Sequence, residues 1–269
     1  MPATRFDRDT DVRSRGDGVF EGRIDRGWWI ERGPNGGYVA ALLLRALAGA
    51  VDDPDRSPRS LTVHYLAPPR EGPVRVETDI ERQGRSLTFV SGRLRQDDRL
   101  LATAVAAFAI PMPGPTFSDI AMPDAVPLDR AEPLRLPAGT VPMRDRYESR
   151  WAVGHPPFSG APQAVAGGWI RLVEPRPVDA PVVTALTDAW MPPVFSRFSE
   201  PMAVPTVDLT VHFRTALPHP GMADDDFCLT VFRSQVAGGG FIEEDGEVWS
   251  PDGVLLAHSR QLAVLLPVG

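Results

Sequence analysis

Two stretches of the chain are apolar on nearly every side, and each begins with a helix-start signal. Asn35–Val51 reads NGGYVAALLLRALAGAV, in which polar side chains are almost absent after the opening Asn-Gly-Gly. Such a stretch predicts a buried helix, because a helix at the surface needs a polar face. The second stretch, Asp179–Trp190, is shorter, with Asp179 as the expected N-cap and Pro181 in the first turn. The pattern therefore predicts one buried helix in each half of the chain.

Nearly the same five residues occur twice, as LTVHY at Leu61–Tyr65 and as LTVHF at Leu209–Phe213. Each copy follows one predicted helix and precedes further segments that are rich in β-formers and bounded by Gly, Arg or Asp. Both series end in a segment that contains LLA, at Leu100–Ala102 and Leu255–Ala257. Two β-rich segments can look alike by chance, but chance does not bring matching flanks. The repeated order of strand, buried helix and four strands indicates an internal duplication.

A proline-rich stretch separates the two halves. Pro111–Arg150 holds eight prolines and little periodicity, which predicts a long surface connection rather than a strand or helix. We expect an N-terminal domain over residues 1–110, a linker over 111–150 and a C-terminal domain over 151–269. A helix that is apolar all round must be enclosed, and a curved antiparallel sheet encloses it most simply. The predicted fold class is α+β, with two such sheets, each around a central helix, joined into one long sheet.

Composition excludes several classes of function. The net charge of -7 argues against broad capture of nucleic acid, which needs a basic face. The first twenty residues are polar and contain no apolar core of a signal peptide. The most apolar run, Tyr38–Leu44, is too short to insert across a membrane. These features predict a cytoplasmic protein.

Residue types that are missing or rare exclude further chemistry. All 28 basic residues are arginine, so a Schiff base, a Walker phosphate loop and a Ser-Lys pair are excluded. Cys228 is the only cysteine and lies in the apolar run FCLTVF, which favours a buried structural thiol. The histidines show no metal-ligand spacing, and no G-x-S-x-G elbow exists. We expect no metal and no cofactor.

The order and spacing of several motifs resemble the acyl-CoA thioesterase II family, whose fold is a double hot-dog. In the first half the resemblance rests on NGGYVAALLLRAL, SLTVHYLAPP and QGRSLTF, and in the second half on LTDAWMPP, PTVDLTVHF and SPDGVLLAHSRQLAVL. The resemblance implies a catalytic trio at Asp188, Thr206 and Gln261 that holds the water attacking a thioester carbonyl. It also places Gly36 and Gly37 at the opening of the first helix, where free backbone N–H groups could stabilise the oxyanion.

The resemblance implies hydrolysis of a fatty or related acyl-CoA to free acid and CoA, with the acyl chain in a tunnel between helix and sheet. The alternative is a non-catalytic acyl-CoA or lipid-binding protein of the same fold. Open edge strands favour a homo-oligomer, for which we expect a dimer of double hot-dogs. One departure is that Thr62 stands where family members carry histidine, which leaves a role for this residue open.

The residues also have an interpretation of their own. Asp188 lies in an otherwise apolar element. It either caps the following Pro turn, faces solvent at the helix end, or is a desolvated carboxylate with a raised pKa, suited to take a proton from water. Strand alternation places Arg260 and Gln261 on opposite faces, so one of them points inward. Thr206 alone carries no signal, because threonine is common in strands.

The internal repeat predicts a single active site per chain. Aligning the two LTVH copies places Pro58 opposite Thr206, and aligning the two LLA copies places Ala106 opposite Gln261. The first-half helix has no carboxylate between Gly36 and its end. The first copy therefore lacks all three polar groups, and the site is expected to use second-half side chains closed by the first-half helix.

Overall fold

The computed structural model describes residues 2–135 and 139–267. The first half begins with a capped helical turn and is mostly sheet. Its elements are α1 (Arg5–Asp9), β1 (Val12–Gly16), β2 (Val19–Ile24), the 3₁₀ helix η1 (Arg26–Trp28), α2 (Gly36–Val51), β3 (Ser57–Tyr65), β4 (Gly72–Gln83), β5 (Leu87–Gln96) and β6 (Arg99–Ala109).

The second half repeats this order with additional short elements. These are β7 (Glu132–Pro133), the 3₁₀ helix η2 (Pro142–Arg146), β8 (Tyr147–Gly154), β9 (Ala164–Leu172), α3 (Ala180–Leu186), α4 (Val194–Arg197), β10 (Met202–Ala203), β11 (Thr206–Phe213), β12 (Cys228–Ser234), β13 (Ala237–Gly238), β14 (Phe241–Trp249), β15 (Leu255–Val264) and β16 (Leu266–Pro267).

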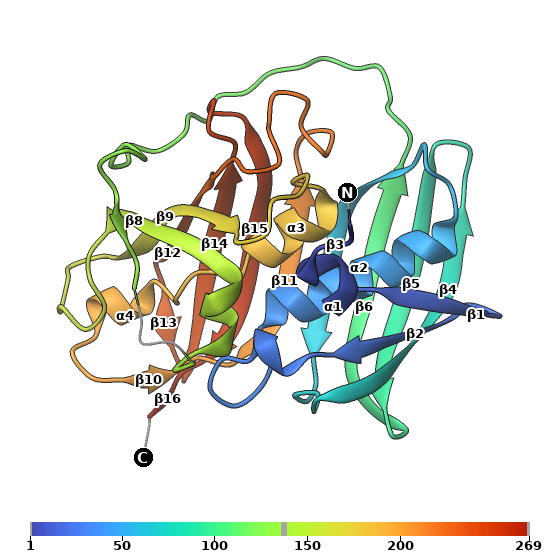
Figure 1. The fold of residues 1–269 in the computed structure, drawn as a ribbon, viewed down its shortest axis with the longest axis horizontal. Helices are drawn as coiled ribbons and strands as arrows, with labels where there is room; N and C mark the ends of the chain where they lie inside the picture. The colour runs from blue at the N-terminus through green and yellow to red at the C-terminus, as the bar shows by residue number, and fades with distance from the viewer. Residues whose placement is uncertain (1, 136–138, 268–269) are drawn as a thin grey trace.

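One antiparallel sheet of 14 strands runs through both halves, in the order β1-β2-β4-β5-β6-β3-β11-β15-β14-β12-β9-β8-β7, with β13 beside β14. From the centre outward the two halves mirror each other, since β3, β6, β5 and β4 correspond to β11, β15, β14 and β12. The joint is the antiparallel pair β3–β11, formed by the two LTVH strands. The expected single long sheet is confirmed, and Figure 1 shows it extending behind α2 and α3.

Strands β3 and β11 are linked through side chains as well as backbone. Thr62 Oγ1 lies 3.0 Å from Thr210 Oγ1, with the two residues directly opposite in the ladder. On β3 the flanking Leu61 and Val63 are buried, whereas Thr62 is on the other face with the exposed His64. Thr62 therefore stabilises the joint between the halves and does not face the core.

Helix α2 is mostly buried, as its apolar sequence predicts. Asn35 caps its first turn by accepting a hydrogen bond from the Tyr38 N–H, and Asp52 ends it in the left-handed conformation, with φ of 46°. Eleven of its 16 residues are buried, which is the arrangement expected for a helix without a polar face.

Helix α3 is shorter than the apolar stretch from which it was predicted. It begins after Asp179, the expected N-cap, and ends at Leu186, before Asp188 and Trp190. Its last residues tighten into a turn in which the N–H of Asp188 donates to Ala185 O. Two consecutive prolines, at 192 and 193, prevent the helix from resuming at once. The difference matters because it places Asp188 in a turn rather than within the helix.

The connection between the halves runs from β6 over the molecule, as the long green segment of Figure 1 shows. The expectation of a linker without strand or helix is wrong for its last part. Within residues 132–150 the chain forms β7, η2 and the start of β8. Pro142 is tolerated there because it occupies the first turn of η2, where its missing N–H costs nothing.

Over residues 2–135 and 139–267, none of the helices combines the length and apolar character that crossing a membrane would require.

Candidate active site

The three predicted catalytic side chains form one hydrogen-bonded group. The Thr206 hydroxyl donates to Gln261 Oε1 at 2.9 Å. The Gln261 Nε2 group lies 3.5 Å from Asp188 Oδ1, at the limit for a hydrogen bond. These residues come from β11, β15 and the turn after α3, so the tertiary fold brings together positions up to 73 residues apart.

Asp188 faces the N-terminus of α2. Its Oδ2 atom accepts from the Gly37 N–H at 2.9 Å and from Asn35 Nδ2 at 2.8 Å. The same Asn35 nitrogen also donates to the Asp188 backbone carbonyl at 2.6 Å. A helix N-terminus favours a negative charge, because its first N–H groups lack partners within the helix.

Asn35 is a residue of the site that the sequence interpretation missed. Its side chain has two functions, since Oδ1 caps α2 while Nδ2 holds Asp188. The available signal was its place directly before a glycine pair at the start of a buried helix. The sequence pattern marked this segment only as the opening of the helix, so it predicted neither the cap nor the bond to Asp188.

The close approach of α2 and α3 requires glycine at position 37. A methyl group there would lie 2.6 Å from the Ala185 carbonyl oxygen and 3.0 Å from Asp188 Cβ. The Gly37 N–H, which we expected to face an oxyanion, points at Asp188 instead. A substrate oxygen would have to share this amide with the carboxylate.

The pKa of Asp188 is raised, chiefly because the carboxylate is withdrawn from water. Hydrogen bonds from the Gly37 amide, Gln261 and the Gly36 amide, together with the positive charge of Arg144, oppose this effect. Arg144, from η2, donates to the Ala189 carbonyl at 2.8 Å, and burial lowers its pKa to about 10. The environment of Asp188 therefore favours proton uptake while keeping the carboxylate paired.

A β-bulge turns Thr206 toward Gln261. In β11 the buried side chains are Leu209, Val211 and Phe213, and strict alternation would place Thr206 on the opposite face. The ladder with β15 is irregular between Thr206 and Asp208, so the alternation is broken there. Bulges commonly re-aim a side chain in this way.

Gln261, and not its neighbour Arg260, is the inward-facing residue of β15. Gln261 is 5% exposed, whereas Arg260 is exposed and paired with Asp245. Directly opposite Gln261 on β14 stands Glu244, which accepts a hydrogen bond from Gln261 Nε2. Burial, followed by the charge of Asp188, raises the pKa of Glu244 to about 8. The sequence interpretation missed Glu244, although alternation with the buried Ile242 predicts that it faces inward.

The same backbone positions in the first half carry no such chemistry. Leu209 pairs with Gln261 in the second half, and its repeat counterpart Leu61 pairs with Ala106. The counterpart of Thr206 is Pro58, at a matching bulge of β3. The ladder therefore reproduces the sequence alignment: at these corresponding positions the polar group occurs in the second half and not in the first.

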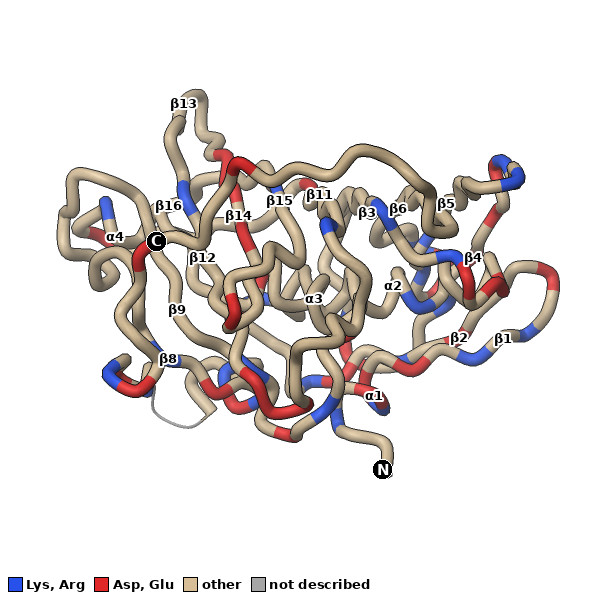
Figure 2. Tube along the Cα trace, turned by 90° about the horizontal axis from the view of Figure 1, so that it is seen from above, with Lys and Arg blue, Asp and Glu red and all other residues tan. Residues whose placement is uncertain are grey.

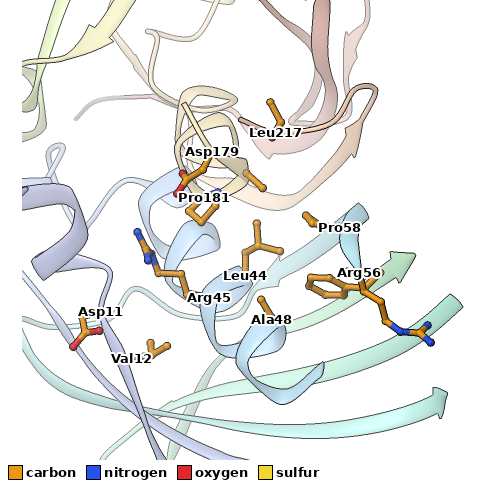
Figure 3. A pocket seen from close by; sticks show the side chains of 12 residues that line it. Asp11, Val12, Leu44, Arg45, Ala48, Arg56, Pro58, Asp179, Pro181 and Leu217 are labelled. Atoms are coloured by element: carbon orange, nitrogen blue, oxygen red, sulfur yellow. The ribbon is translucent and has the colours of Figure 1, made fainter. Parts of the chain in front are cut away.

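A cleft of about 410 Å³ lies beside Pro58, the first-half counterpart of Thr206 (Figure 3). It lies between the start of α3, the later turns of α2 and the start of β3, lined mainly by apolar side chains. Its arginines are committed elsewhere, because Arg45 pairs with Asp7 and Arg56 pairs with Asp53. In Figure 3 the Arg56 side chain points away from the cleft. None of the three predicted catalytic residues lines it, so it is not the expected acyl tunnel beside them.

No group of three or more His, Cys, Asp or Glu suited to a metal ion occurs within the described ranges 2–135 and 139–267. The polar groups that surround Asp188 are carboxyl, amide and hydroxyl groups together with the Arg144 guanidinium.

The two halves of the sheet mirror each other across the β3–β11 pair, which is the arrangement of a tandem-repeat protein. The hydrogen-bonded group of Asp188, Thr206 and Gln261 is its candidate active site. The acyl-CoA thioesterase N-terminal domain matches residues 25–109, and the acyl-CoA thioesterase C-terminal domain matches residues 122–265. The chain therefore belongs to the acyl-CoA thioesterase family.

Individual proteins resemble the chain over nearly its whole length. An uncharacterised protein of Mycobacterium tuberculosis is 29% identical, over 92% of this chain and 91% of its own. A solved structure from Alicyclobacillus acidocaldarius, a protein of unknown function with a hot dog fold, has a TM-score of 0.88 and 30% identity, covering 98% of this chain and 99% of its own. An acyl-CoA thioesterase II from Mycobacterium marinum shares the fold, with a TM-score of 0.79, 20% identity and coverage of 98% and 99%.

Proposed function

We propose that this protein is an acyl-CoA thioesterase that hydrolyses its substrate with a water held by Asp188, Thr206 and Gln261. The single observation that carries the proposal is the hydrogen-bonded group of these three side chains at the N-terminus of α2, in a chain of this family. Membership of the family supports the reaction class, and the site geometry supports the assignment of residues.

Asp188 is the proposed base. A thioester carbonyl is attacked by water only if a proton leaves the water as its oxygen bonds to carbon. The raised pKa of Asp188 makes the carboxylate a better acceptor for that proton than an ordinary surface aspartate. When the carbon–sulfur bond breaks, the protonated Asp188 can return the proton to the CoA thiolate. The products are the free acid and CoA, and the carboxylate is restored.

Thr206 and Gln261 are the proposed water ligands. Because the Thr206 hydrogen is donated to Gln261 Oε1, the lone pairs of Thr206 Oγ1 remain available. A water between Thr206 and Asp188 can donate one hydrogen to each, which leaves its own lone pair free to attack. Gln261 contacts both Thr206 and Asp188 and so fixes their positions relative to each other.

The N-terminus of α2 has two proposed roles. The Gly36 and Gly37 amides hold Asp188 as an acceptor, and we propose that they also stabilise the oxyanion once Asp188 is protonated. Protonation removes the charge that attracts these amides, just as negative charge develops on the substrate oxygen.

Steady-state hydrolysis of a panel of acyl-CoA thioesters, followed by release of free thiol, tests the function. We expect turnover by the wild type and a fall of roughly 10²–10⁴-fold for Asp188→Asn, which keeps the shape but cannot accept the proton. Ala48→Ser, on the exposed part of α2, is the matched control and should retain activity. Turnover that survives Asp188→Asn contradicts the site assignment. Binding of acyl-CoA without turnover by the wild type favours the alternative of a non-catalytic acyl-binding protein.

A further inference from the structure

Glu244 is a buried carboxyl group next to the candidate site that the proposed hydrolysis does not use. It is 9% exposed and lies on the inward face of β14, between the buried Ile242 and Val248 on the same face. Figure 2 shows the acidic stretch of β14 that contains it. Its neighbours Glu243 and Asp245 point to the other face, where Asp245 pairs with Arg260. Only Glu244 of the three therefore faces the site.

The fold itself does not require a carboxyl group at this position. In the first half, Val90 of β5 stands directly opposite Ala106 of β6. In the second half, Glu244 of β14 stands directly opposite Gln261 of β15, at the corresponding place in the ladder. Val90 is fully buried, so the same sheet position accepts an apolar side chain. A polar pair has replaced an apolar pair only in the half that carries Thr206.

The contact between Glu244 and Gln261 decides which way the Gln261 amide points. An amide side chain can be turned by half a rotation at little cost unless its neighbours distinguish oxygen from nitrogen. Thr206 does not distinguish them, because a hydroxyl can donate or accept. The two carboxyl groups together do: an ionised Asp188 can only accept, and Glu244 Oε1, as the carbonyl oxygen of an uncharged carboxyl group, accepts from the same Nε2 atom.

We propose that Glu244 is a positioning residue, which holds the Gln261 amide with Nε2 toward the two carboxyl groups and Oε1 toward Thr206. This inference rests on the proposed function of the same site. In this orientation Thr206 must donate its hydrogen to Gln261, and its lone pairs face the attacking water. With the amide reversed, Thr206 would accept from Gln261, and its hydrogen would compete with the water for Asp188.

The protonation state of Glu244 suits this task. Burial and the charge of Asp188 raise the pKa of Glu244 to about 8, so at neutral pH it is mostly uncharged and accepts through its carbonyl oxygen. The charged groups around it are Asp188 across Gln261, Glu243 and Asp245 on its own strand, and Arg144 beside Asp188. When Asp188 is ionised, an uncharged Glu244 leaves the pair of carboxyl groups with one negative charge, on the proposed base. Above pH 8 a second charge would oppose formation of the oxyanion.

Three variants test the inference, all measured with a substrate that the wild type hydrolyses. Glu244→Val installs the first-half residue and should lower kcat about tenfold, the effect of losing one hydrogen bond, with KM within about twofold. Glu244→Gln keeps an acceptor and should recover most of the loss at neutral pH. In the Gln261→Ala background, Glu244→Val should cause no further loss, because no amide remains to be oriented.

The pH profile adds a readout that a purely structural role would not change. The kcat of the wild type should fall above about pH 8, and this fall should be absent in Glu244→Gln. A Glu244→Val enzyme with wild-type kcat overturns the inference, as does a Glu244→Gln enzyme that is as slow as Glu244→Val. If Glu244→Val does not fold, the pH profile of kcat for Glu244→Gln still tests the inference: an alkaline fall as in the wild type would overturn it. A wild type without turnover would contradict the proposed function itself, which separates the two failures.

Discussion

The contact between Asn35 and Asp188 gives the sharpest prediction for catalysis. Asn35→Ser keeps a good N-cap residue for α2, because a serine hydroxyl can accept from the first-turn N–H groups. The shorter side chain cannot reach Asp188, so both donations from Asn35 Nδ2, at 2.8 Å to Oδ2 and 2.6 Å to the carbonyl, are lost. Asn35→Asp also preserves the cap but directs a second carboxylate at Asp188.

The magnitude follows from the lost bond to a charged group. Such a hydrogen bond contributes about 1.5–3 kcal/mol, and each pKa unit corresponds to about 1.4 kcal/mol, so the pKa of Asp188 should rise by roughly 1–2 units in Asn35→Ser. Asp188 acts as a base only when ionised, so a higher pKa moves the acid limb of the rate profile toward higher pH. On that limb the rate falls roughly 10–100-fold, and it recovers as pH rises. Asn35→Asp should shift the limb further, because like charges disfavour ionisation.

The assay is the pH dependence of kcat/KM for thiol release, with Ala48→Ser as the control on the same helix. The expected order of the acid limbs, from low to high pH, is wild type, Asn35→Ser and then Asn35→Asp, with Ala48→Ser superimposed on the wild type. Thermal unfolding of Asn35→Ser checks that the cap is retained. An acid limb that stays within about 0.3 unit in both Asn35 variants refutes the assignment of Asp188 as the base.

Three further predictions concern stability and reactivity. Gly37→Ala should lower the free energy of unfolding in urea by about 1–3 kcal/mol, because the new methyl group overlaps the Ala185 carbonyl, whereas Gly114→Ala, with open space around it, should stay within about 0.5 kcal/mol. The folded protein binds a proton at Glu244 more tightly than the unfolded chain, so stability should fall as pH rises from the ordinary value of 4.5 through about 8; Glu244→Gln should flatten this slope in urea titrations at several pH values. Cys228 is buried, and burial raises the pKa of its thiol to about 12, so a thiol reagent at pH 8 should label it only after denaturation.

The fold was predictable because both halves of the sequence repeat the same order of apolar segments. The buried helix at α2 and the two LTVH strands follow from residues whose burial depends on local periodicity, and the single long sheet follows from pairing the edge strands of the two repeats. The end of α3 was not predictable to the residue, since apolar character continues through Trp190 after the helix has stopped. Elements within the proline-rich stretch were also missed, because prolines tolerated at a helix start or a sheet edge resemble those of a loop.

The site was only partly predictable, for a different physical reason. Alternation along one strand shows which face a residue occupies, but not what stands opposite it on the neighbouring strand. The sequence therefore showed that either Arg260 or Gln261 faces inward. It could not show that Glu244 contacts Gln261, because that contact depends on the β14–β15 register. The bulge that turns Thr206 inward leaves no mark in the sequence beyond the preceding Pro205. Asn35 was missed because its contact with Asp188 joins residues 153 positions apart, which no local pattern reveals.

The two halves place different side chains at equivalent positions of the same backbone. At corresponding ladder positions the first half has Val90, Ala106 and Pro58, and the second half has Glu244, Gln261 and Thr206. The backbone is equivalent, so neither folding nor pairing of the strands demands the polar set. Burying polar groups costs stability unless each finds a partner, and here each partner is another member of the set. Such mutual dependence predicts that replacing all three residues by their first-half counterparts will destabilise the protein less than the sum of the single replacements, while removing activity. Urea unfolding of the triple and single variants measures this difference, and strictly additive losses would contradict the proposed network.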